Sequence, residues 1–230
     1  MSNDTSAGSE PLLQAVELQT HPQPPNSVIW LHGLGADGYD FVPVVRELDA
    51  LKAPPARYVF PHAPTRAVTI NNGMVMRAWY DILGMDLVRR EDEAGVRASQ
   101  GLVEALIERE VARGTPRSRI VLAGFSQGGA ITLQAGLRQA EPLAALLALS
   151  TYLPLAAAFD AERAATSQHV PIFMAHGRSD PVIPLARATA SRDQLKAAGY
   201  AADWHEYDMP HSVCEQEIRD IATFLQRVLA

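Results

Sequence analysis

The chain has 230 residues, of which 47% are hydrophobic, 20% charged and 7% aromatic. These values are typical of a globular protein that is long enough to bury a core without disulfides or structural metals. A single cysteine excludes an intrachain disulfide framework. The 20 basic and 26 acidic residues give a net charge of −6, which argues against a nucleic-acid partner, because phosphate backbones bind to basic surfaces.

Residues 1–10 are polar and lack the cationic start and the apolar stretch of a secretory signal. We expect them to form a disordered tail that precedes one domain over residues 11–230. The longest apolar run, residues 143–149, is far shorter than the roughly 20 residues needed to cross a bilayer. The sequence therefore predicts a cytoplasmic protein without an integral membrane segment.

Short apolar runs alternate along the chain with longer amphipathic stretches. Candidate strands lie at residues 12–18 (an edge strand), 28–31, 58–60, 120–123, 146–149, 172–175 and 204–207. Candidate helices lie at about 39–51, 95–113, 127–139, 185–198 and 212–229. Apolar runs of this kind suit strands that are covered on both faces. The alternation predicts an α/β fold with a mostly parallel sheet and helices on both of its faces.

The stretch 61–92 interrupts this alternation. It contains a turn signal at Asn71-Asn72-Gly73 and several Met and aromatic residues. Loops of this length in a compact domain are usually functional or disordered, and the apolar content argues against disorder. We expect the stretch to line a substrate pocket; the alternative is an extra structural element that covers the sheet.

The strongest chemical signal is a Gly-x-Ser-x-Gly motif made by Gly124, Ser126 and Gly128, which directly follows an apolar strand and precedes a helix. This context is typical of a nucleophile elbow, a sharp turn in which side chains two residues before and after the serine would collide. The turn places the serine at a helix N-terminus, where free amides favour a developing negative charge. Ser126 is therefore the predicted nucleophile, with a chance motif in a glycine-rich turn as the alternative.

A serine nucleophile needs a histidine base and an acid that orients it, and in this architecture the acid precedes the histidine in the chain. His211 lies in a predicted loop after the last strand, and His176, at the end of an earlier strand, is the competing candidate. Asp180 lies beyond the C-terminal end of a strand, where catalytic loops gather in open α/β sheets. Asp208 is the alternative acid.

The oxyanion that forms during acyl transfer needs two backbone amide donors. Gln127 supplies one as the residue after the nucleophile. The second candidate is Leu34, between Gly33 and Gly35 in the turn that follows the strand 28–31. A phosphate-binding loop is the alternative reading of this turn, but it lacks G-x-G-x-x-G and the P-loop lysine.

The sequence contains no metal-binding motif of the H-E-x-x-H or C-x-x-C type. We expect Cys214 to be a small buried residue; a reactive thiol beside His211 is the alternative.

Five motifs together resemble the carboxylesterase/phospholipase family, which includes bacterial type II carboxylesterases and eukaryotic acyl-protein thioesterases (lysophospholipases). The motifs are His32-Gly33-Leu34-Gly35, Trp79-Tyr80-Asp81, Gly124-Phe125-Ser126-Gln127-Gly128-Gly129-Ala130, Asp180-Pro181-Val182-Ile183-Pro184 and His211-Ser212-Val213-Cys214. The stretches 36–41 and 76–82 look closest to the bacterial carboxylesterases. The resemblance extends from about Val28 to the C-terminus.

This resemblance implies an α/β-hydrolase fold without a large cap domain. It implies a catalytic triad of Ser126, Asp180 and His211, with oxyanion amides from Leu34 and Gln127. Family members hold the acyl chain in an apolar groove, and the matching positions here are Trp79, Leu83, Tyr152 and Val182. No cofactor or metal is implied, and relatives often form homodimers.

We therefore expect a serine esterase, a carboxylesterase that cleaves carboxylic esters of short-to-medium acyl chains. One alternative is an acyl-protein thioesterase or lysophospholipase that acts on longer acyl chains. A more remote alternative is a non-catalytic binding protein on a hydrolase fold. The elbow geometry serves esters and thioesters equally.

Overall fold

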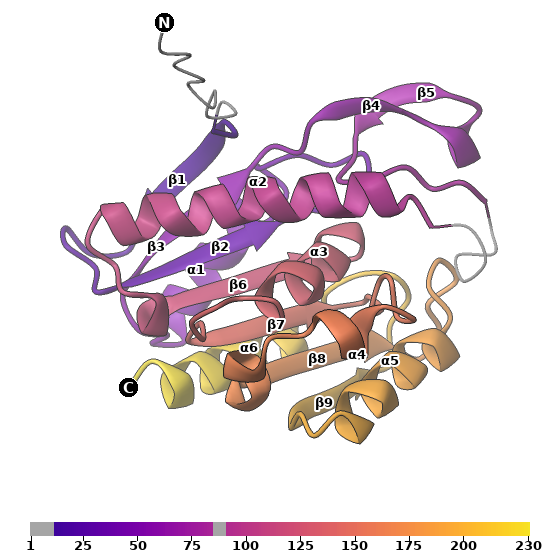
Figure 1. The fold of residues 1–230 in the computed structure, drawn as a ribbon. Coiled ribbons are helices and arrows are strands. Elements are labelled where there is room, and N and C mark those ends of the chain that lie inside the picture. Colours follow the sequence, from indigo (N-terminus) through magenta and orange to yellow (C-terminus); the bar gives the residue numbers. More distant parts are fainter. Residues whose placement is uncertain (1–11, 85–90) are drawn as a thin grey trace, which may run out of the picture.

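The computed structural model describes residues 12–84 and 91–230. Its centre is a seven-stranded twisted sheet with the strand order β1-β3-β2-β6-β7-β8-β9 (Figure 1). The strands are β1 (Ala15–Gln19), β2 (Asn26–Leu31), β3 (Ala56–Pro61), β6 (Ile120–Phe125), β7 (Ala145–Leu149), β8 (Ile172–Gly177) and β9 (Ala202–Tyr207). All neighbouring strands pair in parallel except β1, which runs antiparallel to β3.

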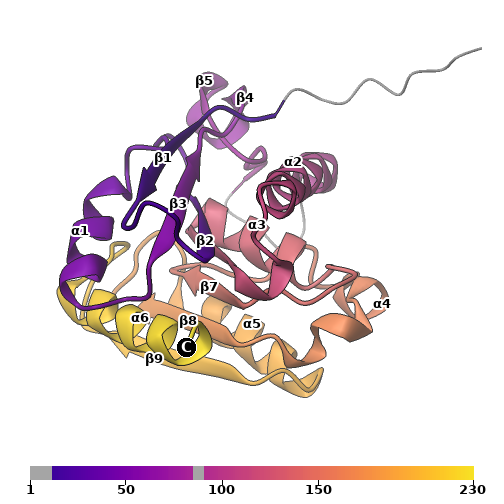
Figure 2. The ribbon, with the colours of Figure 1, turned by 90° about the vertical axis from the view of Figure 1, so that its left-hand side faces the viewer.

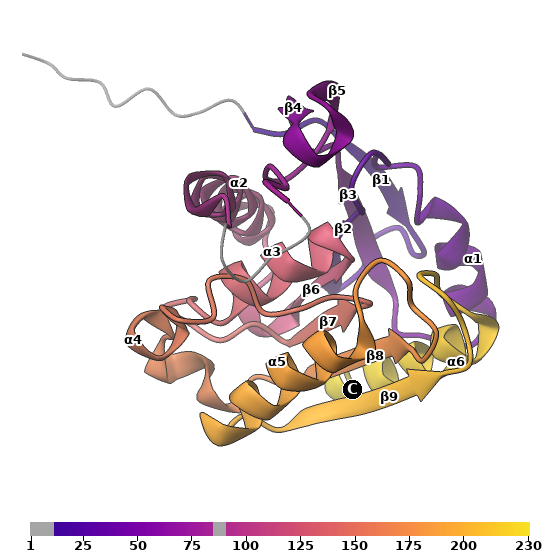
Figure 3. The ribbon, with the colours of Figure 1, turned by 90° about the vertical axis from the view of Figure 1, so that its right-hand side faces the viewer.

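Helices cover both faces of the sheet (Figures 2 and 3). They are α1 (Val42–Ala50), α2 (Glu93–Ala112), α3 (Gln127–Gly136), α4 (Phe159–Glu162), α5 (Leu185–Ala197) and α6 (Glu215–Val228), with short 3-10 turns η1 (Thr69–Asn71), η2 (Arg117–Arg119) and η3 (Ala165–His169). Helices α1 and α6 pack on one face, and α2, α3 and α5 pack on the other. The predicted mostly parallel sheet between two helical layers is confirmed, and the described residues add no large cap domain.

The alternation of side chains along the strands divides the core into two layers. In β2, Val28 and Trp30 face α1 and α6, whereas Ile29 and Leu31 face α2 and α3. All four are buried, as are the residues of the neighbouring strand β6 up to Gly124. Burial on both faces explains why these strands appear in the sequence as continuous apolar runs.

The predicted elements differ from the observed ones mainly at their ends. Helix α1 begins at Val42, not at residue 39, because Pro43 occupies its first turn, where its fixed φ suits a helix start. The edge strand begins at Ala15, not at residue 12, and the last helix at Glu215, not at residue 212. The predicted tail 1–10 lies outside the described residues, so the tail and the domain boundary at residue 11 stay predictions.

The stretch 61–92 contains more regular structure than the sequence indicated. Strands β4 (Thr65–Val68) and β5 (Met74–Arg77) form an antiparallel hairpin that projects from one end of the molecule (Figure 1). The turn of this hairpin contains η1 and Asn72, whose φ of 55° is the left-handed conformation that asparagine tolerates. Residues 85–90 of the stretch lie outside the described residues.

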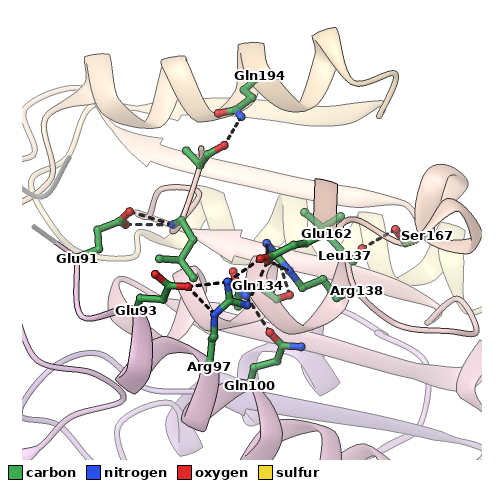
Figure 4. Close-up of polar contacts among 12 residues, drawn as sticks. Glu91, Glu93, Arg97, Gln100, Gln134, Leu137, Arg138, Glu162, Ser167 and Gln194 are labelled. Carbon is green, nitrogen blue, oxygen red and sulfur yellow. Dashed lines mark hydrogen bonds and ion pairs between the residues drawn. The ribbon is translucent and has the colours of Figure 1, made fainter. Parts of the chain in front are cut away.

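A network of charged and amide side chains ties α2 to α3 and α4 (Figure 4). The carboxylate of Glu162 lies 2.6 Å from Arg97 Nη2 and 2.8 Å from Arg138 Nη2. The side-chain amide of Gln134 donates to Gln100 across the α2–α3 contact at 2.8 Å. Because α3 starts at the predicted nucleophile, this network fixes the position of α2 relative to the elbow.

In the part of the chain that the structure describes, no helix is both long enough and apolar enough to cross a membrane.

Candidate active site

Ser126 occupies a tight turn between β6 and α3. Its φ of 54° and ψ of −119° are strained for a residue with a side chain. Gly124 and Gly128 make the turn possible: a Cβ on Gly124 would lie 2.4 Å from the carbonyl carbon of Gly128, and one on Gly128 would lie 2.4 Å from the carbonyl oxygen of Leu31. The Ser126 amide donates to Leu149 in β7 at 2.8 Å, which anchors the turn to the sheet.

His211 reaches Ser126 from the loop between β9 and α6. Its Nε2 lies 2.9 Å from Ser126 Oγ, and its ring packs against Phe125 with 4.7 Å between the ring centroids. The loop approaches the end of β8 closely, because a Cβ on Gly177 would lie 2.3 Å from the carbonyl oxygen of Met209. Only glycine at position 177 allows the loop to take this path.

Asp180 orients the imidazole from the other side. Its Oδ2 accepts the Nδ1 hydrogen of His211 at 2.6 Å, and its Oδ1 accepts the backbone amides of Val182 and Ile183 at 2.8 and 2.9 Å. A carboxylate held this way places the histidine proton on Nδ1 and leaves Nε2 free to accept the serine hydrogen. The arrangement is able to transfer a proton from Ser126 to His211.

His176 and Asp208 do not contact Ser126. His176 is fully buried, and its Nε2 donates to the Ile183 carbonyl at 2.8 Å. Burial lowers the pKa of His176, although the Ile183 carbonyl and Asp180 act in the opposite direction. Asp208 is exposed at the end of β9. His176 Nε2 also lies 3.4 Å from Asp180 Oδ2. The structure thus brings together Ser126, Asp180 and His211, and neither alternative reaches the serine.

The two residues that are predicted to supply the oxyanion amides, Leu34 and Gln127, line the same cavity as Ser126. Gln127 is the first residue of α3, where the helix supplies no acceptor for the backbone N–H. The turn that carries Leu34 is tied to the hairpin, because the amide of Gly35 donates to Arg77 at 2.9 Å.

The cavity beside Ser126 is apolar and has a volume of about 200 Å³. Its lining residues are Leu34, Ile70, Tyr80, Ile82, Gly84, Ser126, Gln127, Tyr152, Pro181, Val182 and Ile183. Of the four predicted groove positions, Tyr152 and Val182 line this cavity, whereas Trp79 and Leu83 do not. Trp79 is fully buried, with its indole N–H donating to the His32 carbonyl at 2.9 Å. Leu83 does not line the cavity, but its neighbours Ile82 and Gly84 do.

Tyr80 is a cavity residue that sequence reasoning missed, although it lies in the quoted Trp79-Tyr80-Asp81 motif. Its hydroxyl shares a 2.8 Å hydrogen bond with that of Tyr152. Burial raises the pKa of both tyrosines. The guanidinium of Arg187 lies 3.9 Å from the Tyr152 ring centroid, a cation–π contact that supports this wall from behind.

No group of three or more His, Cys, Asp or Glu side chains among residues 12–84 and 91–230 is arranged to hold a metal ion. Cys214 is half-buried at the N-cap of α6, less buried than we expected.

The chain also matches known proteins over most of its length. The sequence model of the phospholipase/carboxylesterase family matches residues 14–229. Acyl-protein thioesterase 1 of Neurospora crassa is 41% identical over 213 residues, which cover 86% of this chain and 85% of that protein. Acyl-protein thioesterase 1 of Mycosarcoma maydis is 40% identical over 223 residues, which cover 90% and 92% of the two chains.

The crystal structure of Arabidopsis thaliana SOBER1 is similar to most of this chain. It has a TM-score of 0.84 at 30% identity and covers 89% of this chain and 99% of that one. A carboxylesterase from Bacillus cereus, 17% identical with a TM-score of 0.76, shares the fold. The family model covers nearly the entire described domain, and two relatives exceed 30% identity over most of its length. The chain therefore belongs to the phospholipase/carboxylesterase family and is a hydrolase with the α/β-hydrolase fold.

Proposed function

We propose that this chain is a serine hydrolase that cleaves carboxylic esters of short-to-medium acyl chains through an acyl-enzyme. The observation that carries the proposal is the unbroken chain of hydrogen bonds from Ser126 through His211 to Asp180, with distances of 2.9 and 2.6 Å. A serine hydroxyl is a weak nucleophile by itself, and such a chain supplies the base and fixes its tautomer.

The reaction begins when His211 Nε2 accepts the Ser126 proton while Oγ attacks the acyl carbonyl carbon. The carbonyl oxygen becomes an oxyanion that accepts hydrogen bonds from the backbone amides of Leu34 and Gln127. His211 then gives its proton to the leaving alcohol as the carbon–oxygen bond breaks. Asp180 stabilises the imidazolium throughout.

Water completes the cycle. His211 accepts a proton from the water molecule, whose oxygen attacks the acyl carbon of the acyl-enzyme. The second oxyanion collapses, the bond from carbon to Ser126 Oγ breaks, and the serine recovers its proton from His211. The products are a carboxylic acid and the free enzyme.

The size of the cavity supports an upper limit on acyl length. Its volume of about 200 Å³ is small for a ligand pocket, since such pockets usually measure about 300–1,000 Å³. A cavity of this size suits a short-to-medium acyl chain, so we expect about four to ten carbons to fit best. The apolar lining favours hydrocarbon over polar acyl groups.

A second candidate is the hydrolysis of acyl thioesters. It is favoured by the two curated relatives that are named acyl-protein thioesterase 1 and that match this chain at 40–41% identity. The same attack on the carbonyl carbon applies, and His211 protonates a thiolate in place of an alkoxide. Longer acyl chains would then have to leave the cavity or widen it.

The test is hydrolysis of p-nitrophenyl esters with acyl chains of two to sixteen carbons, beside an acyl-peptide thioester series of the same lengths. Ser126→Ala serves as the blank. We expect kcat/KM to peak between four and ten carbons and the activity to vanish in the blank. A steady rise in rate beyond twelve carbons would refute the short-chain assignment, and a preference for long thioesters would establish the second candidate in its place.

A further inference from the structure

Trp79 makes hydrogen bonds on three sides although it does not touch the cavity. It is fully buried in the core layer between the sheet and α2. Its indole Nε1–H donates to the carbonyl oxygen of His32 at 2.9 Å, and its backbone N–H donates to the side-chain oxygen of Gln127 at 2.8 Å. The hydroxyl of Ser99 in α2 donates to its carbonyl oxygen. These contacts reach both segments that supply the proposed oxyanion amides.

On one side, Trp79 holds the turn that carries Leu34. The His32 imidazole accepts the amide of Ala63 at Nε2 (3.0 Å), so its proton lies on Nδ1, which donates to the Gly33 carbonyl at 2.7 Å. The Gly33 carbonyl and the Leu34 N–H belong to one planar trans peptide and point in opposite directions. Fixing this carbonyl therefore fixes the direction of the Leu34 N–H, and the indole of Trp79 fixes the preceding peptide.

On the other side, Trp79 holds Gln127 through the side chain of that residue. The Gln127 carboxamide accepts from the Trp79 amide and donates from Nε2 to the Tyr80 carbonyl at 2.6 Å. The carboxamide thus bridges the backbone N–H of residue 79 and the backbone carbonyl of residue 80. This bridge restrains the first turn of α3, which carries the Gln127 backbone amide.

We infer that Trp79 is a positioning residue that holds the two oxyanion amides, those of Leu34 and Gln127, at a fixed separation. The inference rests on the proposed acyl-transfer function. It assigns a part in that reaction to a residue that touches neither the substrate nor the reacting atoms. An oxyanion site acts because its donors are set before charge develops, so loosening one of them lowers transition-state stabilisation more than substrate binding.

The experiment compares Trp79→Phe with Trp30→Phe as a matched control. Both tryptophans are at least 99% buried, but the Trp30 indole nitrogen has no hydrogen-bond partner among the described residues. Each variant removes the same atoms from the core, and only Trp79→Phe removes a bond to the oxyanion turn. Trp30 lies in the opposite core layer, stacked on Phe41, where a phenylalanine ring keeps the aromatic contact.

We expect Trp79→Phe to lower kcat on a p-nitrophenyl ester by about 10- to 100-fold, the range for a misplaced or lost oxyanion donor. KM should change by less than about threefold. Binding of a trifluoromethyl ketone, which forms an oxyanion on Ser126, should weaken by the same factor as kcat/KM. Trp30→Phe should keep kcat and inhibitor affinity within about twofold of the parent protein.

A second variant protects the test against misfolding. Gln127→Met keeps the backbone amide and removes both side-chain hydrogen bonds, so it breaks the other half of the same link. It should likewise lower kcat and leave KM nearly unchanged, with folded protein quantified by circular dichroism.

Equal kcat values for Trp79→Phe and Trp30→Phe, or a loss confined to KM in the folded variants, would overturn the inference. The proposed function fails if the parent protein hydrolyses neither esters nor thioesters. The inference about Trp79 fails alone if the parent protein is active and the variants do not show the expected loss of kcat. The two failures are therefore distinguishable.

Discussion

Glu217 is a buried carboxyl that stabilises the native chain only while it is protonated. The protein should therefore become less stable as the pH rises and this proton is lost. It lies in the first turn of α6 and is fully buried. Burial raises its pKa from 4.5 to about 8; the Cys214 amide lowers it and Asp220 raises it further. Between these two values the native chain binds a proton that the unfolded chain has lost, so the free energy of unfolding falls with increasing pH.

Replacing this carboxyl with an amide removes the titration. Each pH unit within the window between 4.5 and about 8 corresponds to about 1.4 kcal/mol. Glu217→Gln should therefore gain stability over the parent protein by about 3 kcal/mol as the pH is raised from 5 to 7.5. The assay is urea denaturation followed by circular dichroism at several pH values, with catalysis by both proteins measured in parallel.

Glu215→Gln is the matched control on the same helix. Its carboxylate is exposed and pairs with Arg219 on the surface, so its free energy of unfolding should change by less than about 1 kcal/mol at every pH. A constant difference between Glu217→Gln and the parent protein across this range would refute the reasoning, because it would show that Glu217 is ionised in the native state throughout.

Three further substitutions test the site. Asp180→Asn should lower kcat by about 10⁴-fold with little change in KM, since an amide orients His211 in the wrong tautomer; steady-state ester kinetics check this. Gly128→Ala should lower the free energy of unfolding by roughly 1–3 kcal/mol in urea titrations, because its Cβ would lie 2.4 Å from the Leu31 carbonyl oxygen. Gly84→Leu should shift the preferred ester toward two to four carbons with acetate turnover retained, because Gly84 lines the cavity and an added Cβ meets no atom of residues 12–84 and 91–230 within 4 Å. An unchanged chain-length profile in a folded Gly84→Leu protein would contradict this placement of the cavity.

The local parts of the site were predictable because their causes are local. The elbow is encoded by Gly124 and Gly128 around Ser126, and both glycines are required by contacts within a few residues or with the neighbouring strand. The strands were recognisable because burial on both faces produces continuous apolar runs. The histidine and acid followed from chain order, since loops at the carboxyl ends of parallel strands meet at one edge of the sheet.

The role of Trp79 was not predictable in the same way. The family resemblance implied that Trp79 lines the acyl groove, but its partners His32 and Gln127 lie 47 and 48 residues away in the sequence. No periodicity or spacing encodes which core layer such a side chain enters. The hairpin β4–β5 was missed because its four-residue strands are largely exposed and lack the apolar signature of the central sheet.

Labelling with a fluorophosphonate probe tests the central claim most directly. The probe reacts with an activated serine hydroxyl, and mass spectrometry of the digested protein identifies the modified residue. We predict one label on Ser126, loss of ester hydrolysis in proportion to labelling, and no label in Ser126→Ala or, at the same dose, in His211→Ala. Labelling at another residue, or hydrolysis that persists in Ser126→Ala, would contradict the assignment of the nucleophile.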